Sequence, residues 1–103
     1  MIRLGFAIVR GRSMEPTYVD GDRLLVAHGA RPVAGRTHVV ALPDGPHGPR
    51  PVAVKRLSAR VPGGWWAVRD NPDEGVDSRT VGAIPEADVL ARVLVRLPRR
   101  GRR

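Results

Sequence analysis

The stretch GRSMEPTYVDGDRLLV, residues 11–26, joins a serine-containing loop to a glycine-aspartate turn and then to a short apolar run. Similar short runs of Val, Leu, Ala and Ile recur along the chain, which also holds 12 glycines and 10 prolines. Many short apolar runs between turn signals are typical of an all-β barrel or sandwich. We therefore predict an all-β fold, a small coiled β-barrel or sandwich, with strands at residues 5–10, 23–28, 38–42, 52–59, 65–69 and 89–97.

The remaining segments fit one small domain. Residues 43–51 begin and end with proline and contain Gly45 and Gly48, so we expect a surface loop there. Residues 86–93 follow Pro85 and fit either a short helix or the start of a strand, and the later alternation favours the strand. A chain of 103 residues is sized for one domain with a modest core. We assign residues 1–98 to this domain and residues 99–103 to a basic C-terminal tail.

Composition excludes several function classes. The sequence has no cysteine, so disulfides and thiolate metal sites are excluded, and we expect neither a metal nor a cofactor. The formal charge of +8 at pH 7 favours acidic partners, nucleic acid or an anionic membrane surface. The arginines are spread through the chain, however, and their one dense cluster is the tail. We therefore expect no nucleic-acid partner, and membrane contact that is peripheral at most.

The first apolar stretch, Leu4–Val9, is far shorter than the roughly 20 residues that span a bilayer. It is also too short for the apolar part of a secretory signal. We expect no transmembrane segment and a cytoplasmic protein. A membrane-associated protein is the alternative if an anchor precedes this sequence.

Ser13 is a candidate nucleophile because it follows a predicted strand, at a point where the chain leaves regular structure. A serine hydroxyl needs a neighbouring base to remove its proton. The histidines are poor candidates for this base, because the sequence has no Gly-x-Ser-x-Gly motif, in which a histidine would activate the serine. We expect each of the three, His28, His38 and His47, at the surface.

Lys55 is the candidate base, and it is the only lysine in the sequence. Strand alternation over residues 52–57 places Lys55 on one face with Ala53 and Leu57, and Val54 and Arg56 on the other. Burial disfavours the charged form of lysine, so its pKa falls and the neutral amine becomes available as a base. A lone lysine in a strand is more often solvated, and the hypothesis depends on its pairing with Ser13.

Four blocks, in this order, resemble the signal peptidase I family of serine-lysine proteases. Gly11–Thr17 resembles the family's nucleophile box, Ser-Met-x-Pro-Thr, and Gly21–Val26 matches the turn and strand after it. Val54–Leu57 matches the box with the general-base lysine, and Asp70–Arg79 resembles a late box in which Asp-Asn is followed by Asp-Ser-Arg. The resemblance covers most of the chain and implies the all-β catalytic core of that family.

The resemblance implies Ser13 as nucleophile, Lys55 as general base and a supporting role for the late box. We expect Asp77 and Arg79 to form a partly buried ion pair beneath the lysine-bearing strand, and Asp70 and Asn71 to cap their turn. A polar turn without functional meaning would explain this box equally well. The predicted supporting residues are Gly11, Asp70, Asn71, Asp77, Ser78 and Arg79, and the predicted substrate-binding residues are Val9, Met14, Tyr18 and Val54.

The sequence departs from the family pattern at two glycines. Gly11 stands where many relatives have a hydroxyl that helps to hold the oxyanion, so the Ser13 backbone N–H would carry that role. Gly75 stands where many relatives have a serine that hydrogen-bonds the lysine, so Ser78 or Thr80 would orient Lys55 instead.

The resemblance is strongest to the nickel-type superoxide dismutase maturation proteases, whose substrate is a precursor protein with an N-terminal leader peptide. A general leader peptidase of the signal peptidase I type is the first alternative. A repressor-type self-cleaving protein is less consistent, because only 12 residues precede Ser13 and neither a DNA-binding domain nor a scissile bond fits there. A catalytically inactive, peptide-binding β domain is the remaining alternative.

Overall fold

The computed structural model describes residues 1–99. Its strands are β1 Arg3–Ile8, β2 Arg23–His28, β3 Thr37–Ala41, β4 Val52–Val61, β5 Gly64–Val68 and β6 Val89–Arg96. The helical elements are one turn of α-helix, α1 Ser78–Val81, and one 3-10 turn, η1 Glu86–Asp88. The all-β prediction is confirmed, and each predicted strand is found within two residues of its predicted bounds.

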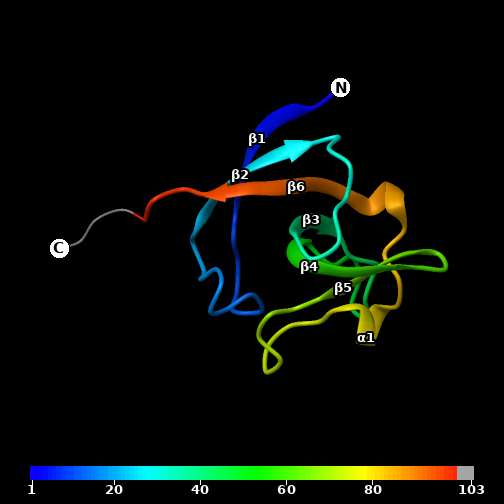
Figure 1. The fold of residues 1–103 in the computed structure, drawn as a ribbon. Coiled ribbons are helices and arrows are strands. Elements are labelled where there is room, and N and C mark those ends of the chain that lie inside the picture. The colour runs from blue at the N-terminus through cyan, green and yellow to red at the C-terminus, as the bar shows by residue number, and fades with distance from the viewer. Residues whose placement is uncertain (100–103) are drawn as a thin grey trace.

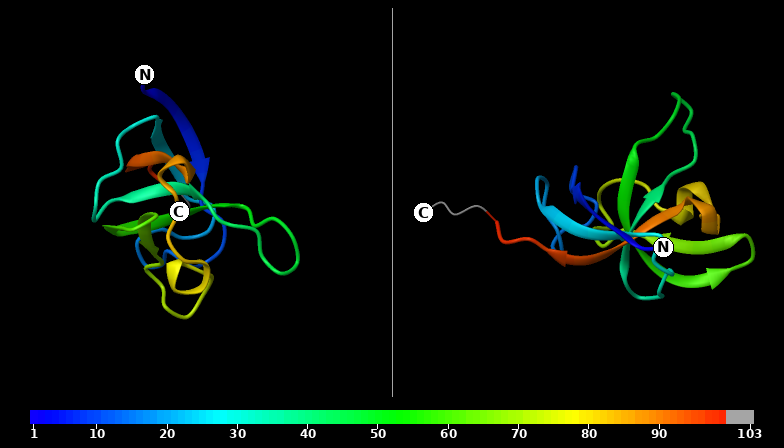
Figure 2. Two further views of the ribbon diagram at one scale, coloured as in Figure 1. Left: turned by 90° about the vertical axis from the view of Figure 1, so that its right-hand side faces the viewer. Right: turned by 90° about the horizontal axis from the view of Figure 1, so that it is seen from above.

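The strands form one antiparallel sheet in the order β1-β2-β6-β3-β4-β5 (Figure 1). We predicted a small barrel or sandwich. In the structure, the strands form a single strongly twisted sheet with β1 and β5 at its edges (Figures 1 and 2). The ambiguous segment after Pro85 divides into η1 and β6. Residues 43–51 form no strand, as expected, and Figure 2 shows this loop projecting from the sheet.

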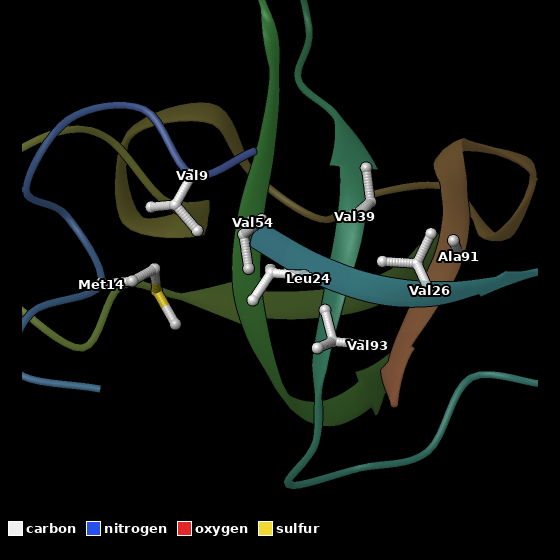
Figure 3. Close-up of a cluster of buried hydrophobic side chains, with 8 residues drawn as sticks. All are labelled: Val9, Met14, Leu24, Val26, Val39, Val54, Ala91 and Val93. Carbon is white, nitrogen blue, oxygen red and sulfur yellow. The ribbon is translucent and has the colours of Figure 1, made fainter. Parts of the chain in front are cut away.

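Buried side chains lie on both faces of the sheet. Val39 and Val40 are neighbours in β3 and belong to different clusters, because successive residues of a strand point to opposite faces. One cluster converges within the curve of the sheet (Figure 3) and comprises Val9, Met14, Leu24, Val26, Val39, Val54, Ala91 and Val93. The other comprises Val40, Leu57, Trp65, Ala67 and Ile84. Val54 and Lys55 are therefore both buried, although they point to opposite faces of β4.

After β6, the chain runs on beside the start of β2, where the Leu97 N–H donates to the Arg23 carbonyl at 2.8 Å. Arg99, the first residue of the predicted basic tail, donates hydrogen bonds of 2.8 and 3.0 Å to the two carboxylate oxygens of Asp22. The rest of that tail, residues 100–103, lies outside the described residues. Within residues 1–99, no helix is long and apolar enough to cross a membrane.

Candidate active site

Ser13 lies on the loop between β1 and β2, and the two ends of this loop are fastened together. The Val9 N–H donates to the Asp22 carbonyl at 2.8 Å, and the Gly21 N–H donates to the Val9 carbonyl at 2.7 Å. The Asp22 side chain accepts a further bond from the Val19 N–H at 2.9 Å. Closing the loop at its base restricts the positions that Ser13 can reach.

Lys55 lies in β4, directly across a short gap from this loop. Its Nζ donates a hydrogen bond of 2.8 Å to Ser13 Oγ. The lysine is 3 % exposed, and Ser13 is partly exposed. The structure thus brings together the two residues that were predicted to act as nucleophile and base, which are 42 positions apart in the sequence.

Burial lowers the pKa of the Lys55 amine below its ordinary value. Two nearby charges modify this effect: the Asp77 carboxylate favours the protonated amine, and the Arg69 guanidinium disfavours it. Burial is the largest of the three influences. Lys55 is therefore shifted toward the neutral form, the only form that accepts a proton.

The charged partner of Asp77 is Arg69, and the predicted ion pair with Arg79 is wrong. Asp77 is 1 % exposed and caps α1 by accepting a bond from the backbone N–H of Arg79 at 3.0 Å. Its other oxygen accepts from the Arg69 N–H at 3.2 Å and lies 3.7 Å from Arg69 Nε. The Arg79 side chain is exposed, because it lies on the solvent side of a single helical turn.

Ser78 and Thr80 do not reach Lys55. The Ser78 hydroxyl is buried and accepts a bond of 2.8 Å from the Ala67 N–H, which joins α1 to β5. Thr80 is exposed. The expectation that one of them orients the lysine is wrong because both lie in α1, which packs on β5.

Gly75 lies against both Ser13 and Lys55, and its segment closes the side of the site that the Ser13 loop and β4 leave open. A Cβ atom built on it would lie 2.7 Å from Ser13 Cβ and 3.9 Å from Lys55 Nζ. The position that was expected to supply a serine thus lies against both residues, and it has no room for a side chain. Arg69 fixes this segment by donating hydrogen bonds to the Glu74 and Gly75 carbonyls.

Asn71 ties the β1–β2 loop that carries Ser13, which we call the nucleophile loop, to the segment after β5. Its backbone N–H donates to the Ser13 carbonyl at 2.8 Å, and its side-chain amide donates to the Arg12 carbonyl at 2.9 Å. The same side chain accepts from the Asp73 N–H at 3.0 Å, so its predicted turn-capping role is present. The loop is thereby held at the residue that carries the hydroxyl.

Asp70 does not cap the turn, and that expectation is wrong. Its carboxylate accepts a bidentate pair of bonds from Arg56 at 3.0 and 2.8 Å, and one from the Thr17 hydroxyl at 2.6 Å. Burial opposes ionisation of this carboxyl, but the bonds from Arg56 and Thr17 outweigh it and leave the pKa of Asp70 below its ordinary value. Because Arg56 follows Lys55 in β4, this bridge fixes the base relative to the nucleophile loop.

Gly11 begins the tight part of the loop, with φ at +81°. Its N–H donates to Asp20 Oδ1 at 2.7 Å, so it is occupied by the loop itself. Among residues 1–99, no hydrogen bond uses the N–H of Ser13. That amide therefore has no acceptor in the described part of the chain.

A groove of about 340 Å³ runs past Ser13 and Lys55, between the nucleophile loop and β4. Three of the four predicted substrate-binding residues, Val9, Met14 and Val54, line it. Tyr18 does not, and its hydroxyl instead shares a bond of 2.9 Å with Thr37 Oγ1. On this side of β4, strand β5 pairs only from Arg56 onward. Residues 52–55 thus pair with β3 on one side, and on the groove side no strand of the described structure pairs with them.

The histidines take no part in this site. His38 is fully buried, so its predicted surface position is wrong. Its ring accepts from the Val33 N–H at 3.2 Å and bonds to the Arg36 carbonyl at 3.0 Å, which gives it a structural role in the β2–β3 connection. His28 is partly buried and His47 is exposed. Within residues 1–99, no group of three or more His, Cys, Asp or Glu side chains could hold a metal ion.

Sequence reasoning missed Arg69, Asp20, Thr17 and Arg56 as parts of the site. Each acts through a contact that spans from 6 to 53 positions of sequence. Thr17 and Arg56 lie within the boxes at Gly11–Thr17 and Val54–Leu57, but neither was assigned a role there. For Arg69, the one available signal is its position at the end of a strand directly before the Asp-Asn pair.

A comparison with models of known protein families gives a match over residues 3–94 to the family described as Peptidase S24-like. No curated protein and no solved structure gives a match. The match spans Ser13, Lys55 and the whole late box. It does not single out signal peptidase I or nickel superoxide dismutase maturation.

Proposed function

Because the chain belongs to the peptidase S24-like family, we propose that it is a serine endopeptidase in which Ser13 is the nucleophile and Lys55 the general base. One observation carries the proposal: the bond of 2.8 Å between a buried lysine amine and a serine hydroxyl, beside an open groove. The family match supports peptidase chemistry in general. The roles of the two residues are inferred from their geometry.

In the proposed mechanism, neutral Lys55 takes the Ser13 proton while Oγ attacks the scissile carbonyl carbon. The developing oxyanion is held by the Ser13 N–H, which has no acceptor in the described structure. Lys55 then gives the proton to the leaving amine as the C–N bond breaks. Water, deprotonated by the same lysine, hydrolyses the acyl-enzyme and restores the serine hydroxyl.

The substrate would bind as an added strand along residues 52–55, where β4 has no strand neighbour on the groove side. Val9, Met14 and Val54 form apolar walls of modest size next to the dyad. We infer that the residues flanking the scissile bond are small, such as Ala or Gly, because larger side chains would meet these walls.

At the finer level, we propose that the reaction removes an N-terminal leader from a precursor of nickel superoxide dismutase. The sequence resemblance supports this assignment. The chemistry is consistent, because a nickel site that uses the substrate's N-terminal amine requires that the preceding peptide bond be cut first. A general leader peptidase is the alternative, favoured if the precursor is not cut.

The test is to co-express the candidate precursor with the wild-type protein, with Ser13→Ala and with Lys55→Arg, and to read its N-terminus by mass spectrometry. We expect a single cut with wild type and a full-length precursor with both variants. Arginine retains the positive charge and bulk but does not deprotonate. Trimming by either variant would refute the dyad. An uncut precursor together with cleavage of other leader peptides would refute only the nickel assignment.

A further inference from the structure

The substrate groove carries more positive than negative charge. Apart from Lys55, its ionisable lining residues are three arginines and one glutamate: Arg10, Arg12, Arg50 and Glu74. Arg12 pairs with Glu15 at 3.3 Å. Within residues 1–99, none of the five ion pairs includes Arg10 or Arg50. The described structure therefore leaves two guanidinium groups at the groove without a carboxylate partner.

Arg50 lies at the end of the groove that is remote from the dyad. Every residue from 50 to 55 lines the groove, with Arg50 at one end and Lys55 at the other. In an extended chain these two ends are at most about 17 Å apart. Pro51 has no N–H, so it ends the row of backbone groups that a substrate strand along residues 52–55 can use. A substrate residue about four or five positions from the scissile bond therefore comes level with Arg50.

The Arg50 guanidinium is held in place by the loop at residues 43–51. Its Nη1 donates hydrogen bonds of 3.0 and 3.2 Å to the Pro43 and Asp44 carbonyls. A Cβ atom built on Gly45 would lie 2.9, 3.0 and 3.0 Å from Cζ, Nε and Nη2 of Arg50. Because these distances are almost equal, the built atom would lie over the flat face of the group. The guanidinium thus stacks on Gly45 and occupies the space that a side chain at position 45 would need.

The loop that holds Arg50 has internal bonds of its own. The Gly45 N–H donates to the Gly48 carbonyl at 2.7 Å, and the Gly48 N–H donates to the Gly45 carbonyl at 3.1 Å. Prolines at positions 43, 46, 49 and 51 restrict the backbone further. Figure 2 shows this loop standing out from the sheet between β3 and β4. The guanidinium is therefore oriented before any ligand binds, which lowers the entropic cost of binding.

One edge of the Arg50 guanidinium is open. Arginine has five N–H donors, and its Nη1 is used by the two loop carbonyls. Among residues 1–99, no acceptor is bonded to Nε or Nη2. This edge presents two parallel N–H groups, the geometry that a carboxylate accepts as a bidentate pair. We propose that Arg50 and its loop form a subsite for an acidic side chain of the substrate, about four or five residues from the bond that is cut.

The proposal rests on the proposed function for the identity of the ligand, a peptide in the groove. The distribution of charge along the groove favours an acidic residue at this end and not beside the dyad. Glu74, the acidic lining residue, is next to Gly75, which lies against Ser13. A second carboxylate there would be repelled, whereas at Arg50 it meets an unpaired positive charge.

The experiment measures peptide binding to Ser13→Ala by fluorescence anisotropy, so the result does not depend on whether Ser13 is a nucleophile. The probes are labelled twelve-residue peptides of threonine with a central pair of alanines, which fit the small-residue walls. One Asp is placed four residues before or after the pair, and each peptide has an Asn counterpart. We expect one of the two Asp peptides to bind about fivefold more tightly than its Asn counterpart, and less so at high salt.

Variants made in the Ser13→Ala protein assign this preference to the subsite. Arg50→Gln should abolish the preference for Asp and leave binding of the Asn peptide unchanged. Gly45→Ala should reduce the preference to less than about twofold, because the new methyl group displaces the guanidinium without removing its charge. Arg79→Gln, the matched control, removes an exposed charge from α1 and should retain the full preference.

Four outcomes would overturn the proposal. The Asp and Asn peptides bind equally, or neither binds; the preference survives Arg50→Gln, so that Arg50 only braces the loop; or Arg79→Gln lowers it as much, so that net charge alone is responsible. If Arg50→Gln does not fold, Gly45→Ala and the comparison of Asp with Asn peptides still decide. Failure of the peptidase itself is read separately, as the absence of any cleavage by wild type.

Discussion

Gly75 is packed against Ser13 so closely that a Cβ atom at position 75 would lie 2.7 Å from the serine Cβ. The glycine also has φ at +81°, a conformation that other residues rarely adopt. A side chain at position 75 would collide with Ser13, so the segment at Glu74 and Gly75 can form a wall of the site only if residue 75 is glycine. The serine that many signal peptidases have at this position would not fit this backbone.

Gly75→Ala should reduce peptidase activity by about 10²-fold, because the new methyl group displaces the Ser13 side chain from Lys55. The measurement is the initial rate on a cleaved leader peptide. Gly82→Ala is a matched control, since Gly82 has φ at +82° but no atom within 4 Å of the added Cβ. Both variants should lose about 1–2 kcal/mol of stability from backbone strain alone. Equal activity losses in the two variants would show that strain, and not contact with Ser13, is responsible.

The rate should rise with pH as Lys55 loses its proton. Burial lowers the pKa of this amine, so the rise should be centred below the value of about 10.4 that is typical of free lysine. The measurement is kcat/KM as a function of pH on a substrate without ionisable groups. Chelators and histidine-directed reagents should have no effect. A profile governed by a group that titrates near the carboxyl range would contradict lysine as the base.

Lys55→Met should abolish activity and yet stabilise the fold, by about 1 kcal/mol or more at neutral pH, because it removes a buried amine from the sheet. The direction in which stability changes with pH follows from the numbers of protons that the folded and unfolded chains bind. Between the lowered folded pKa and the ordinary unfolded pKa, the unfolded chain binds more protons, so wild-type stability rises with pH. The advantage of Lys55→Met in thermal or urea unfolding should therefore shrink as the pH rises. An advantage that is independent of pH would refute a depressed pKa.

The strands could be predicted from sequence because alternation of apolar residues between turns is a local pattern. The pairing of Ser13 with Lys55, which spans 42 positions, was predicted from the family resemblance, because a lysine within a strand is by itself more often solvated. What surrounds the dyad could not be predicted in the same way. The expected partner of Asp77 was Arg79, two residues away, but capping α1 uses the backbone of Arg79 and leaves its side chain in solvent.

His38 shows the same limit in the core. Its neighbours in sequence are those of an ordinary strand end, and they give no indication that its ring would bond to Val33 and Arg36 in the preceding connection. A buried polar side chain is accommodated when hydrogen-bond partners are available. Whether they are available depends on how a loop folds back, which alternation along a strand does not determine.

Asp77→Asn tests whether the buried carboxylate acts on Lys55 through its charge. The asparagine side chain retains an oxygen that can accept from the Arg79 N–H at the start of α1. The negative charge, which favours protonated Lys55, is lost, while the positive charge of Arg69 remains. Loss of the Asp77 charge lowers the pKa of the lysine further, so the acid limb of the kcat/KM profile should move to lower pH.

Asp73→Asn is the control for this shift, because it removes an exposed carboxylate from the same β5–α1 connection and should leave the profile in place. Asp77→Asn should also lower stability, since the ion pair of 3.7 Å with Arg69 is lost. A loss of stability without movement of the profile would mean that Asp77 only supports α1 and β5. Movement of the acid limb toward higher pH would contradict the electrostatic role, because removing a negative charge near an amine does not favour its protonated form.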